Sequence, residues 1–290
     1  MHKRNVKYSK EFAEFIEYLA AGRSLEEQVD DCWKTGNHSI PSVLRTGVLR
    51  NIGVKEANPK SENFIVWSCY VPFWSTNKLR DTVKIVNALG IDYNYSDKEV
   101  CCGAPMVQDS REIIGISEER KKEMDAQAHK MRQFNVDLAE KSGQKIMVYA
   151  CQVCAAVVKR SFPDEPERHR FIYDLIMDKM ENMDLKIEPT TIGFFEGCHK
   201  FYPHNSNLDW KRYRKLLGTV EGLEIIDLPR KICCKQDANA ILENAEKNNL
   251  TQIVAPDGDC HYFLRSAAAV RGGKVEIKNL PEVLLVVLGK

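Results

Sequence analysis

The chain has 290 residues, of which 43% are hydrophobic and 29% are charged, and its formal net charge is +1. This size and composition allow a substantial buried core and predict two domains. The 42 basic residues balance 41 acidic ones without a long basic run, which argues against a nucleic-acid partner. No apolar run is long enough to cross a bilayer, so we expect a cytoplasmic protein without a membrane span.

The first 60 residues read as a helical extension. Phe12, Phe15, Ile16 and Leu19 recur at helical spacing, and acidic residues lie between them. This pattern is typical of an amphipathic helix and unlike a secretory signal, which would need an unbroken apolar run.

Residues 61–186 alternate between predicted strands and predicted helices. In chain order we expect a strand over 63–69, a helix over 78–89, a strand over 91–95, a helix over 118–140 and a strand over 145–151. The apolar stripe of the longest helix consists of Met124, Ala128, Met131 and Leu138. Cys69 and Cys151 close the first and last of these strands, and the pair Cys101-Cys102 precedes the long helix.

Residues 187–290 repeat this order. The expected elements are a strand over 191–198, a helix over 209–217, a strand over 223–228, a helix after Asp237 and a strand over 252–255. Cys198 closes the first strand, Cys233-Cys234 precede the second helix, and Cys260 follows the last strand. The sequence therefore repeats a single cysteine, an adjacent pair and a cysteine near a strand end.

This internal repeat predicts the fold. Cys69 and Cys101 enclose 31 residues, and Cys198 and Cys233 enclose 34. Repeated strands and helices favour two pseudo-repeated α/β units with mainly parallel sheets, over 61–186 and 187–290. Ligands of such sheets gather outside the carboxyl ends of the strands, so the cysteines are expected to converge there.

Cysteines that converge in a reducing compartment favour metal ligation or redox chemistry over a disulfide framework. Neighbouring cysteines such as Cys101 and Cys102 chelate one small ion poorly but can bridge two irons of a cluster, which favours iron–sulfur over zinc. Each adjacent pair precedes a predicted helix, whose N-terminal amides would stabilise negative sulfur. The spacing of Cys151 and Cys154 alone also suits zinc or thiol exchange.

Cys69, Cys101-Cys102-Gly103 and Cys151-x-x-Cys154 together resemble the cysteine-rich CCG domain, which occurs twice in the B subunit of heterodisulfide reductase. The resemblance implies a noncubane [4Fe–4S] cluster held by these five cysteines. It also implies an oxidoreductase subunit that acts on a small disulfide or thiol. The partners implied are a ferredoxin-like C-type subunit and a flavin-containing A-type subunit.

The second half departs from the family pattern. Lys235 replaces the glycine after the second pair, and His261 follows Cys260 where a further Cys-x-x-Cys would begin. In the first half, the 48 residues between the pair and Cys151 exceed the usual family spacing. The second site therefore has four candidate ligands, which suit a [4Fe–4S] cluster, zinc or no metal: Cys198, Cys233, Cys234 and Cys260.

Three further side chains are candidates for a catalytic or tuning role. His199 and His261 are potential ligands or proton donors, or hydrogen-bonded neighbours of the site. Lys235 would place a cation near a negative cluster and favour its reduced state.

Cys32 stands apart from the repeat. Its surroundings resemble the ferredoxin-type C subunit of the same reductases, but Thr35 and His38 stand where two further cysteines would be. One cysteine cannot hold a cubane cluster. Residues 1–60 are then a degenerate relic or docking arm for a ferredoxin-like partner, or a plain helical extension packed on the body.

The resulting hypothesis is a redox subunit of a multi-subunit oxidoreductase. Two alternatives remain: an electron-relay subunit of a quinone-linked or sulfur-oxidising complex, and a zinc-stabilised interaction module without redox activity. The substrate and the direction of electron flow are not encoded in these motifs.

Overall fold

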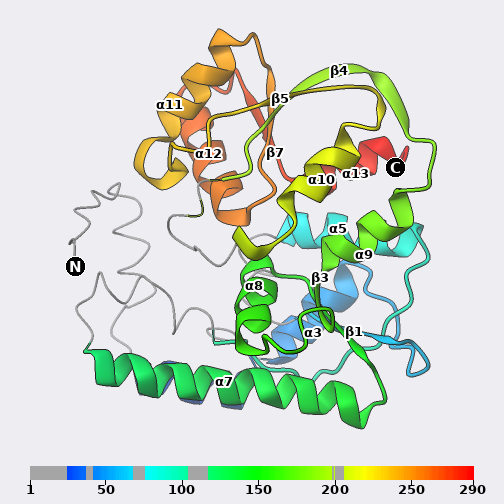
Figure 1. Cartoon of the computed structure of the whole chain (residues 1–290), viewed down its shortest axis with the longest axis vertical. Helices are drawn as coiled ribbons and strands as arrows, with labels where there is room; N and C mark the ends of the chain where they lie inside the picture. The colour runs from blue at the N-terminus through cyan, green and yellow to red at the C-terminus, as the bar shows by residue number, and fades with distance from the viewer. Residues whose placement is uncertain (1–24, 37–41, 68–75, 104–116, 198, 200–205) are drawn as a thin grey trace. The chain divides into compact units, whose positions relative to one another are not determined.

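The computed structural model describes residues 25–36, 42–67, 76–103, 117–197, 199 and 206–290. They form two compact units, which we call the N-terminal unit (24–183 with 201–213) and the C-terminal unit (184–200 with 214–290). Each unit contains one parallel sheet with helices, so the predicted α/β class is confirmed (Figure 1). The predicted helix near Phe12–Leu19 lies outside the described residues. Among the described helices, we find no segment with the length and hydropathy of a membrane span.

The sheet of the N-terminal unit has three parallel strands in the order β1 (Asn63–Val66), β2 (Ile146–Tyr149) and β3 (His169–Phe171). The strand predicted over 91–95 is reduced to one parallel bridge between Asn94 and Phe64. At this bridge the amide of Asn94 donates to the Asn63 carbonyl, and the Asn94 carbonyl accepts the amide of Ile65, each at 2.8 Å. The prediction of a full strand was therefore wrong in length.

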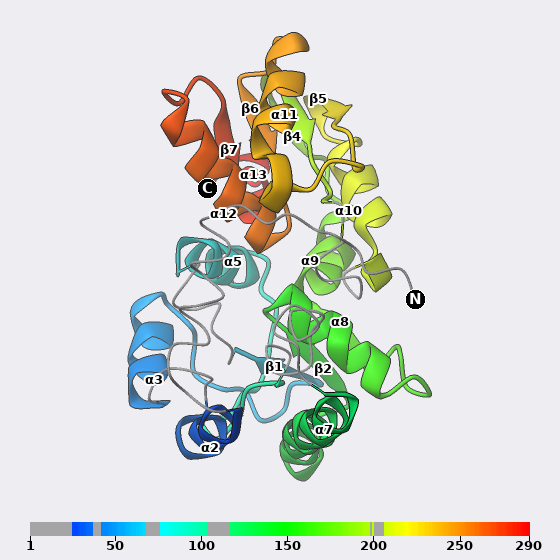
Figure 2. The ribbon, with the colours of Figure 1, turned by 90° about the vertical axis from the view of Figure 1, so that its left-hand side faces the viewer.

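Six helices of the described residues belong to this unit. They are α2 (Leu25–Thr35), α3 (Ser42–Asn51), α5 (Thr76–Ala88), α7 (Glu118–Lys141), α8 (Gln152–Ser161) and α9 (Ile172–Met180). Figure 2 shows β1 and β2 between α3 and α5 on one side and α8 on the other. The helices expected over 78–89 and 118–140 are confirmed as α5 and α7, whereas the sequence did not predict α8, β3 or α9.

Two polar side chains interrupt the buried face of α7. Arg132 and Asn135 are buried there with Met131, Val136 and Ala139. Leu138, which the helical pattern assigned to this face, is only partly buried. The helix therefore presents hydrogen-bonding groups as well as apolar surface to the interior.

The two helices before β1 pack on the N-terminal unit. Cys32 of α2 is fully buried in a cluster with Val100, Cys101, Met124 and Met131. The helix α2 thus contributes to the core of the unit. The docking role for a ferredoxin-like partner stays a prediction.

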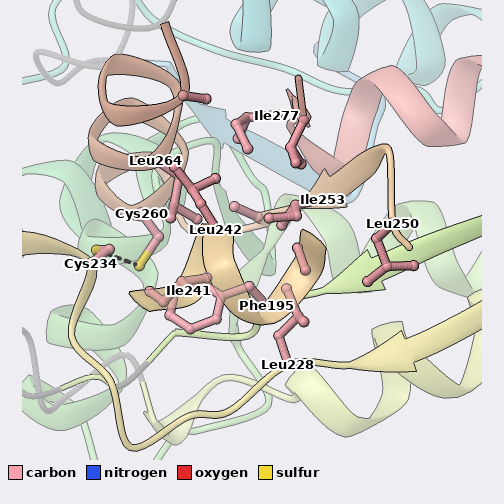
Figure 3. Packing of buried hydrophobic residues seen from close by; sticks show 14 residues of the cluster. Phe195, Leu228, Cys234, Ile241, Leu242, Leu250, Ile253, Cys260, Leu264 and Ile277 are labelled. Carbon is pink, nitrogen blue, oxygen red and sulfur yellow. Dashed lines mark hydrogen bonds between the residues drawn. The ribbon is translucent and has the colours of Figure 1, made fainter. Parts of the chain in front are cut away.

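The C-terminal unit has four parallel strands in the order β5 (Glu221–Asp227), β4 (Lys186–Phe194), β6 (Gln252–Val254) and β7 (Glu276–Lys278). Its helices are α11 (Cys234–Lys247), α12 (Gly258–Val270) and α13 (Leu280–Val287), while α10 (Trp210–Leu217) precedes β5. Figure 3 shows its core, in which Cys234 and Cys260 lie among apolar side chains such as Ile241, Leu242 and Leu264.

Both sheets have the same topology. The Asn94 bridge, β1, β2 and β3 in the first sheet correspond in order to β5, β4, β6 and β7 in the second. A helix follows β2 and β6 directly in each case. The repeat of cysteines in the sequence is therefore matched by a repeat of strand order.

A buried histidine in β3 gives the N-terminal unit a pH response. His169 is fully buried, its Nδ1 atom lies 2.9 Å from the Tyr149 hydroxyl oxygen, and its ring stacks on Phe162. Burial, aided by the charge of Arg168, lowers the pKa of His169 to about 4. The folded protein therefore holds this imidazole neutral at pH values where an unfolded histidine is protonated.

Acidification from about pH 7.5 to about pH 5.5 is expected to lower the free energy of unfolding by about 1 kcal/mol through His169. The unfolded chain takes up a proton near pH ~6.5 and the folded chain does not, so stability is lost as pH falls through this window. Chemical denaturation at both pH values tests this, and His169→Phe should lose that share of the pH dependence. His129→Gln, which removes an exposed histidine of α7, should keep it. Equal pH dependence in all three proteins would contradict the assignment.

Candidate metal centre

The first candidate site lies where β2 ends and α8 begins. Cys102 and Cys154 approach each other with their Sγ atoms 3.0 Å apart, and both side chains are buried. Cys151 is the N-cap residue of α8 and is buried as well, as is Cys101. Cys69, the fifth predicted ligand, lies outside the described residues.

A helix N-terminus that the sequence did not predict lies at this site. The helix expected over 118–140 after the Cys101-Cys102 pair is present as α7, and residues 104–116 between them lie outside the described residues. In addition, α8 begins directly after Cys151 and carries Cys154 in its first turn. Its N-terminal amides and the positive end of its dipole favour negative charge on these sulfurs.

Buried side chains hold the backbone that leads to Cys101 and Cys102. Asn135 of α7 accepts the amide of Val100 at 2.9 Å and donates to its carbonyl at 2.7 Å. Arg45 of α3 donates to the Glu99 carbonyl at 2.9 Å. These contacts replace the strand pairing that this segment lacks, because buried backbone groups must be hydrogen-bonded.

Arg132 connects three parts of this site. Its Nε atom donates to the carbonyl oxygen of Cys102 at 2.9 Å, and its Nη1 atom donates to Ser161 Oγ at 2.5 Å. Burial lowers the pKa of Arg132, while negative charge on Cys102 and Cys154 raises it. A guanidinium thus stands beside the two thiols that approach each other most closely.

The second candidate site has the same arrangement in the C-terminal unit. Cys234 and Cys260 approach with their Sγ atoms 3.3 Å apart, which Figure 3 shows as a dashed line. Cys233 is the N-cap residue of α11, whose first turn carries Cys234, and the backbone leaves helical geometry at Asp237 before the helix that the sequence predicts continues. Cys198 lies outside the described residues.

The N-cap positions show why the second cysteine set is smaller. Cys151 caps α8 and Cys154 follows three positions later; Asp257 caps α12 and Cys260 follows three positions later. Cys260 therefore corresponds to Cys154, and Asp257 stands where the first unit has Cys151. Its Oδ1 atom accepts the amides of Asp259 and Cys260 at 2.9 and 3.1 Å. The sequence pattern instead predicts that Cys260 starts an incomplete Cys-x-x-Cys.

Protons are held firmly on Cys234 and Cys260 of the second site when no metal is bound. The hydrogen bond from Cys234 lowers the pKa of Cys260, but burial and the carboxylates of Asp257 and Asp259 raise it, to about 11 overall. Hydrogen bonds with Cys233 and Cys260, together with burial, raise the pKa of Cys234 well above its ordinary value. Metal binding here must release protons, so it should weaken as the pH falls.

Lys235 lies beside this second pair of thiols. Its side chain is 3% exposed, its Nζ atom lies 2.9 Å from Asp259 Oδ2, and the ammonium lies 5.4 Å from the centre of the Phe263 ring. The predicted cation is therefore present, but a carboxylate partly balances its charge.

The two candidate histidines each face a carboxylate. His199 Nε2 lies 3.5 Å from Glu196 Oε1, and His261 Nε2 lies 3.9 Å from Glu282 Oε2. Gly197, between Glu196 and His199, has a φ of +101°, and a Cβ atom there would lie 3.2 Å from Cys260 Sγ. The backbone before His199 thus passes directly beside the second site. A Cβ atom would crowd the Cys260 sulfur, and the positive φ itself favours glycine.

The structure brings the cysteines together in pairs. Across the residues that it describes, no three His, Cys, Asp or Glu side chains are grouped closely enough to hold a metal ion. The convergence of all five predicted ligands of the first site, and of all four of the second, stays a prediction. The sequence reasoning missed Arg45, Arg132 and Asn135, which carry no motif and are recognised only by their contacts.

Two α/β units with paired cysteines beyond the carboxyl ends of parallel strands define a cysteine-rich α/β protein. Residues 65–159 match the family described as CCG, cysteine-rich domain. The chain therefore contains a CCG domain, which spans β1 through most of α8 and includes all five cysteines of the first site.

Curated proteins similar to the chain share low sequence identity with it. The B subunit of fumarate reductase (CoM/CoB) from Methanothermobacter marburgensis is 19% identical, over 92% of this chain and 53% of that protein. Lactate utilization protein A of a Geobacillus species is 23% identical, over 75% of this chain and 96% of that protein. The D subunit of dihydromethanophenazine:CoB–CoM heterodisulfide reductase from Methanosarcina mazei is 22% identical, over 53% of this chain and 37% of that protein. The chain thus spans about half the length of the fumarate reductase protein.

The residues of the first site fit an iron–sulfur cluster. The donors are thiols, which iron–sulfur clusters prefer, and they are shielded from water. A buried guanidinium beside them has a nitrogen, Nη2, without a hydrogen-bond partner in the described part of the chain. An iron–sulfur cluster, which is negatively charged and has sulfur acceptors, would bind to these thiols and accept a hydrogen bond from Nη2.

Proposed function

We propose that this chain is an iron–sulfur redox subunit that binds a noncubane [4Fe–4S] cluster at the first site. The proposed ligands are Cys69, Cys101, Cys102, Cys151 and Cys154. The observation that carries this proposal is the approach of the buried Cys102 and Cys154 thiols to 3.0 Å within a CCG domain. Two buried thiols so close together suit a shared inorganic partner better than separate structural roles.

When bound, the cluster supplies one-electron transfer chemistry. The chain's own residues place and shield it. The N-terminus of α8 favours negative sulfur at Cys151 and Cys154, and burial keeps water away from the thiolates. Asn135 and Arg45 hold the segment before Cys101 in position.

At the second site we propose a [4Fe–4S] cluster or a zinc ion bound by Cys198, Cys233, Cys234 and Cys260. Lys235 favours the reduced state of a cluster there. His199 and His261, each beside a carboxylate, are proposed to donate protons or to serve as ligands. The buried pair Cys234–Cys260, at 3.3 Å, supports metal binding here.

The proposed activity is reduction or oxidation of a small disulfide or thiol within a heterodisulfide reductase-like complex in the cytoplasm. The proposed partners are a ferredoxin-like C-type subunit and a flavin-containing A-type subunit, because a protein of this kind needs an external source of electrons. Similarity to one component of a CoB–CoM heterodisulfide reductase supports this choice.

A second candidate is an electron-relay subunit without a substrate of its own. Asp257 at the position that Cys151 occupies in the first unit supports it, since disulfide cleavage between two facing clusters requires two complete cysteine sets. Similarity to lactate utilization protein A, of which the match covers 96%, agrees with a different oxidoreductase context.

Metal analysis of anaerobically purified protein separates these functions. Paired clusters predict roughly eight irons per chain, and one cluster predicts roughly four, with or without zinc. A colourless protein that contains only zinc would contradict the redox proposal and support the zinc-stabilised interaction module.

A further inference from the structure

The buried guanidinium of Arg132 belongs to α7, outside the cysteine motif, and its surroundings are unusual for an arginine. Its side chain is 6% exposed. Buried arginines ordinarily pair with a carboxylate, because an isolated buried charge is costly. No such ion pair of Arg132 occurs among the described residues, although the more distant charge of Asp125 also acts on it.

The contacts of Arg132 orient it towards the first site. Its Nε atom donates a hydrogen bond to the Cys102 carbonyl oxygen at 2.9 Å, and its Nη1 atom donates one to Ser161 Oγ of α8 at 2.5 Å. The guanidinium is therefore fixed between the Cys102 segment and α8, the two parts of the chain that carry Cys102 and Cys154. Because a guanidinium is planar and rigid, two fixed nitrogens also fix the third.

The third nitrogen, Nη2, is buried and has no partner within the described ranges of the chain. An unsatisfied buried donor is destabilising, and more so when it is charged, so such donors are rarely retained without a ligand. The group that Nη2 lacks should be anionic, hydrogen-bond accepting and located beside Cys102 and Cys154.

We propose that Arg132 donates a hydrogen bond from Nη2 to the cluster of the first site, at a cysteine thiolate or a bridging sulfide, and stabilises its reduced form. This inference rests on the proposed function, because it takes the cluster to be present. The added electron makes the cluster more negative, so a fixed cation beside it stabilises the reduced state more than the oxidised state. Arg132 is a positioning and tuning residue and not a ligand.

The test is an EPR-monitored redox titration of full-length protein with matched variants. In Arg132→Gln, iron content should stay near that of the wild type, while the ratio of reduced to oxidised cluster at a given potential falls about tenfold, or ~59 mV for one electron. Lys130→Gln removes an exposed cation two residues earlier on the same helix and should leave the titration unchanged.

A second measurement remains decisive if Arg132→Gln does not fold. Wild-type protein labelled with ¹⁵N-arginine should show a nitrogen coupling to the cluster electron spin, and Arg132→Lys should lose that coupling while it keeps its iron. Wild-type protein with iron but without the coupling, or an unchanged potential in a folded Arg132→Gln variant, would overturn this inference alone. Wild-type protein without iron would overturn the proposed function and this inference with it.

Discussion

Replacement of Cys154 by serine is expected to lower the iron content of the purified protein at least roughly tenfold. Loss of groups that merely support a metal ligand already costs about 10–100-fold in metal affinity, and loss of a thiolate ligand should cost no less. Cys102→Ser should have the same effect, since the two sulfur atoms lie 3.0 Å apart and are proposed to share one cluster. Iron per chain and the EPR signal of the oxidised protein measure the outcome.

Cys32→Ser is the matched control. Cys32 is also fully buried, and it packs against Cys101, yet it lies in α2 and outside both predicted ligand sets. The substitution buries a hydroxyl and should lower stability by about 1–3 kcal/mol without lowering iron per folded chain. If Cys154→Ser retains wild-type iron and signal, the first site is assigned wrongly. If Cys32→Ser loses its iron, Cys32 belongs to the ligand set.

Replacement of Arg45 by methionine is expected to lower the free energy of unfolding by about 2–4 kcal/mol. Arg45 is 1% exposed and donates to three backbone carbonyls, those of Gly36, Asp97 and Glu99. Methionine fills most of the volume but leaves these acceptors unsatisfied. Because the contacts join α3 to the segment before Cys101, the variant should also bind iron less completely.

Arg50→Met, near the end of the same helix, is the control for loss of an arginine from α3. Arg50 is exposed, so its replacement should change stability by less than about 0.5 kcal/mol. Urea denaturation of the three proteins, with iron measured on the same samples, gives both readouts. Equal stability of wild type and Arg45→Met would show that the hydrogen bonds of the buried Arg45 guanidinium do not stabilise the packing of α3 against the segment before Cys101.

The strands that carry the cysteines were predictable because their signals are local. Asn63–Val66 and Ile146–Tyr149 are short, largely apolar runs that end before a cysteine, and α7 carries Met124, Ala128 and Met131 at helical spacing. The strand expected over 91–95 failed because its apolar residues, such as Ile91 and Tyr93, are buried without a continuous backbone partner. Burial of a segment can be predicted from its apolar residues, whereas strand pairing depends on which other segment the folded chain places beside it.

The α/β class and the cysteine repeat could be predicted from the amino-acid sequence, because periodicity and spacing are properties of the chain alone, and the resemblance to the CCG domain implied the set of five cysteines. How these parts are supported depends on contacts that form only in the folded chain. The tertiary structure placed the buried polar groups Arg45, Arg132 and Asn135 against the Cys101–Cys102 segment, and it matched Asp257 with Cys151 through their common role as N-caps. Such hydrogen bonds join residues that are far apart in the sequence, and they produce no periodic pattern from which they could be predicted.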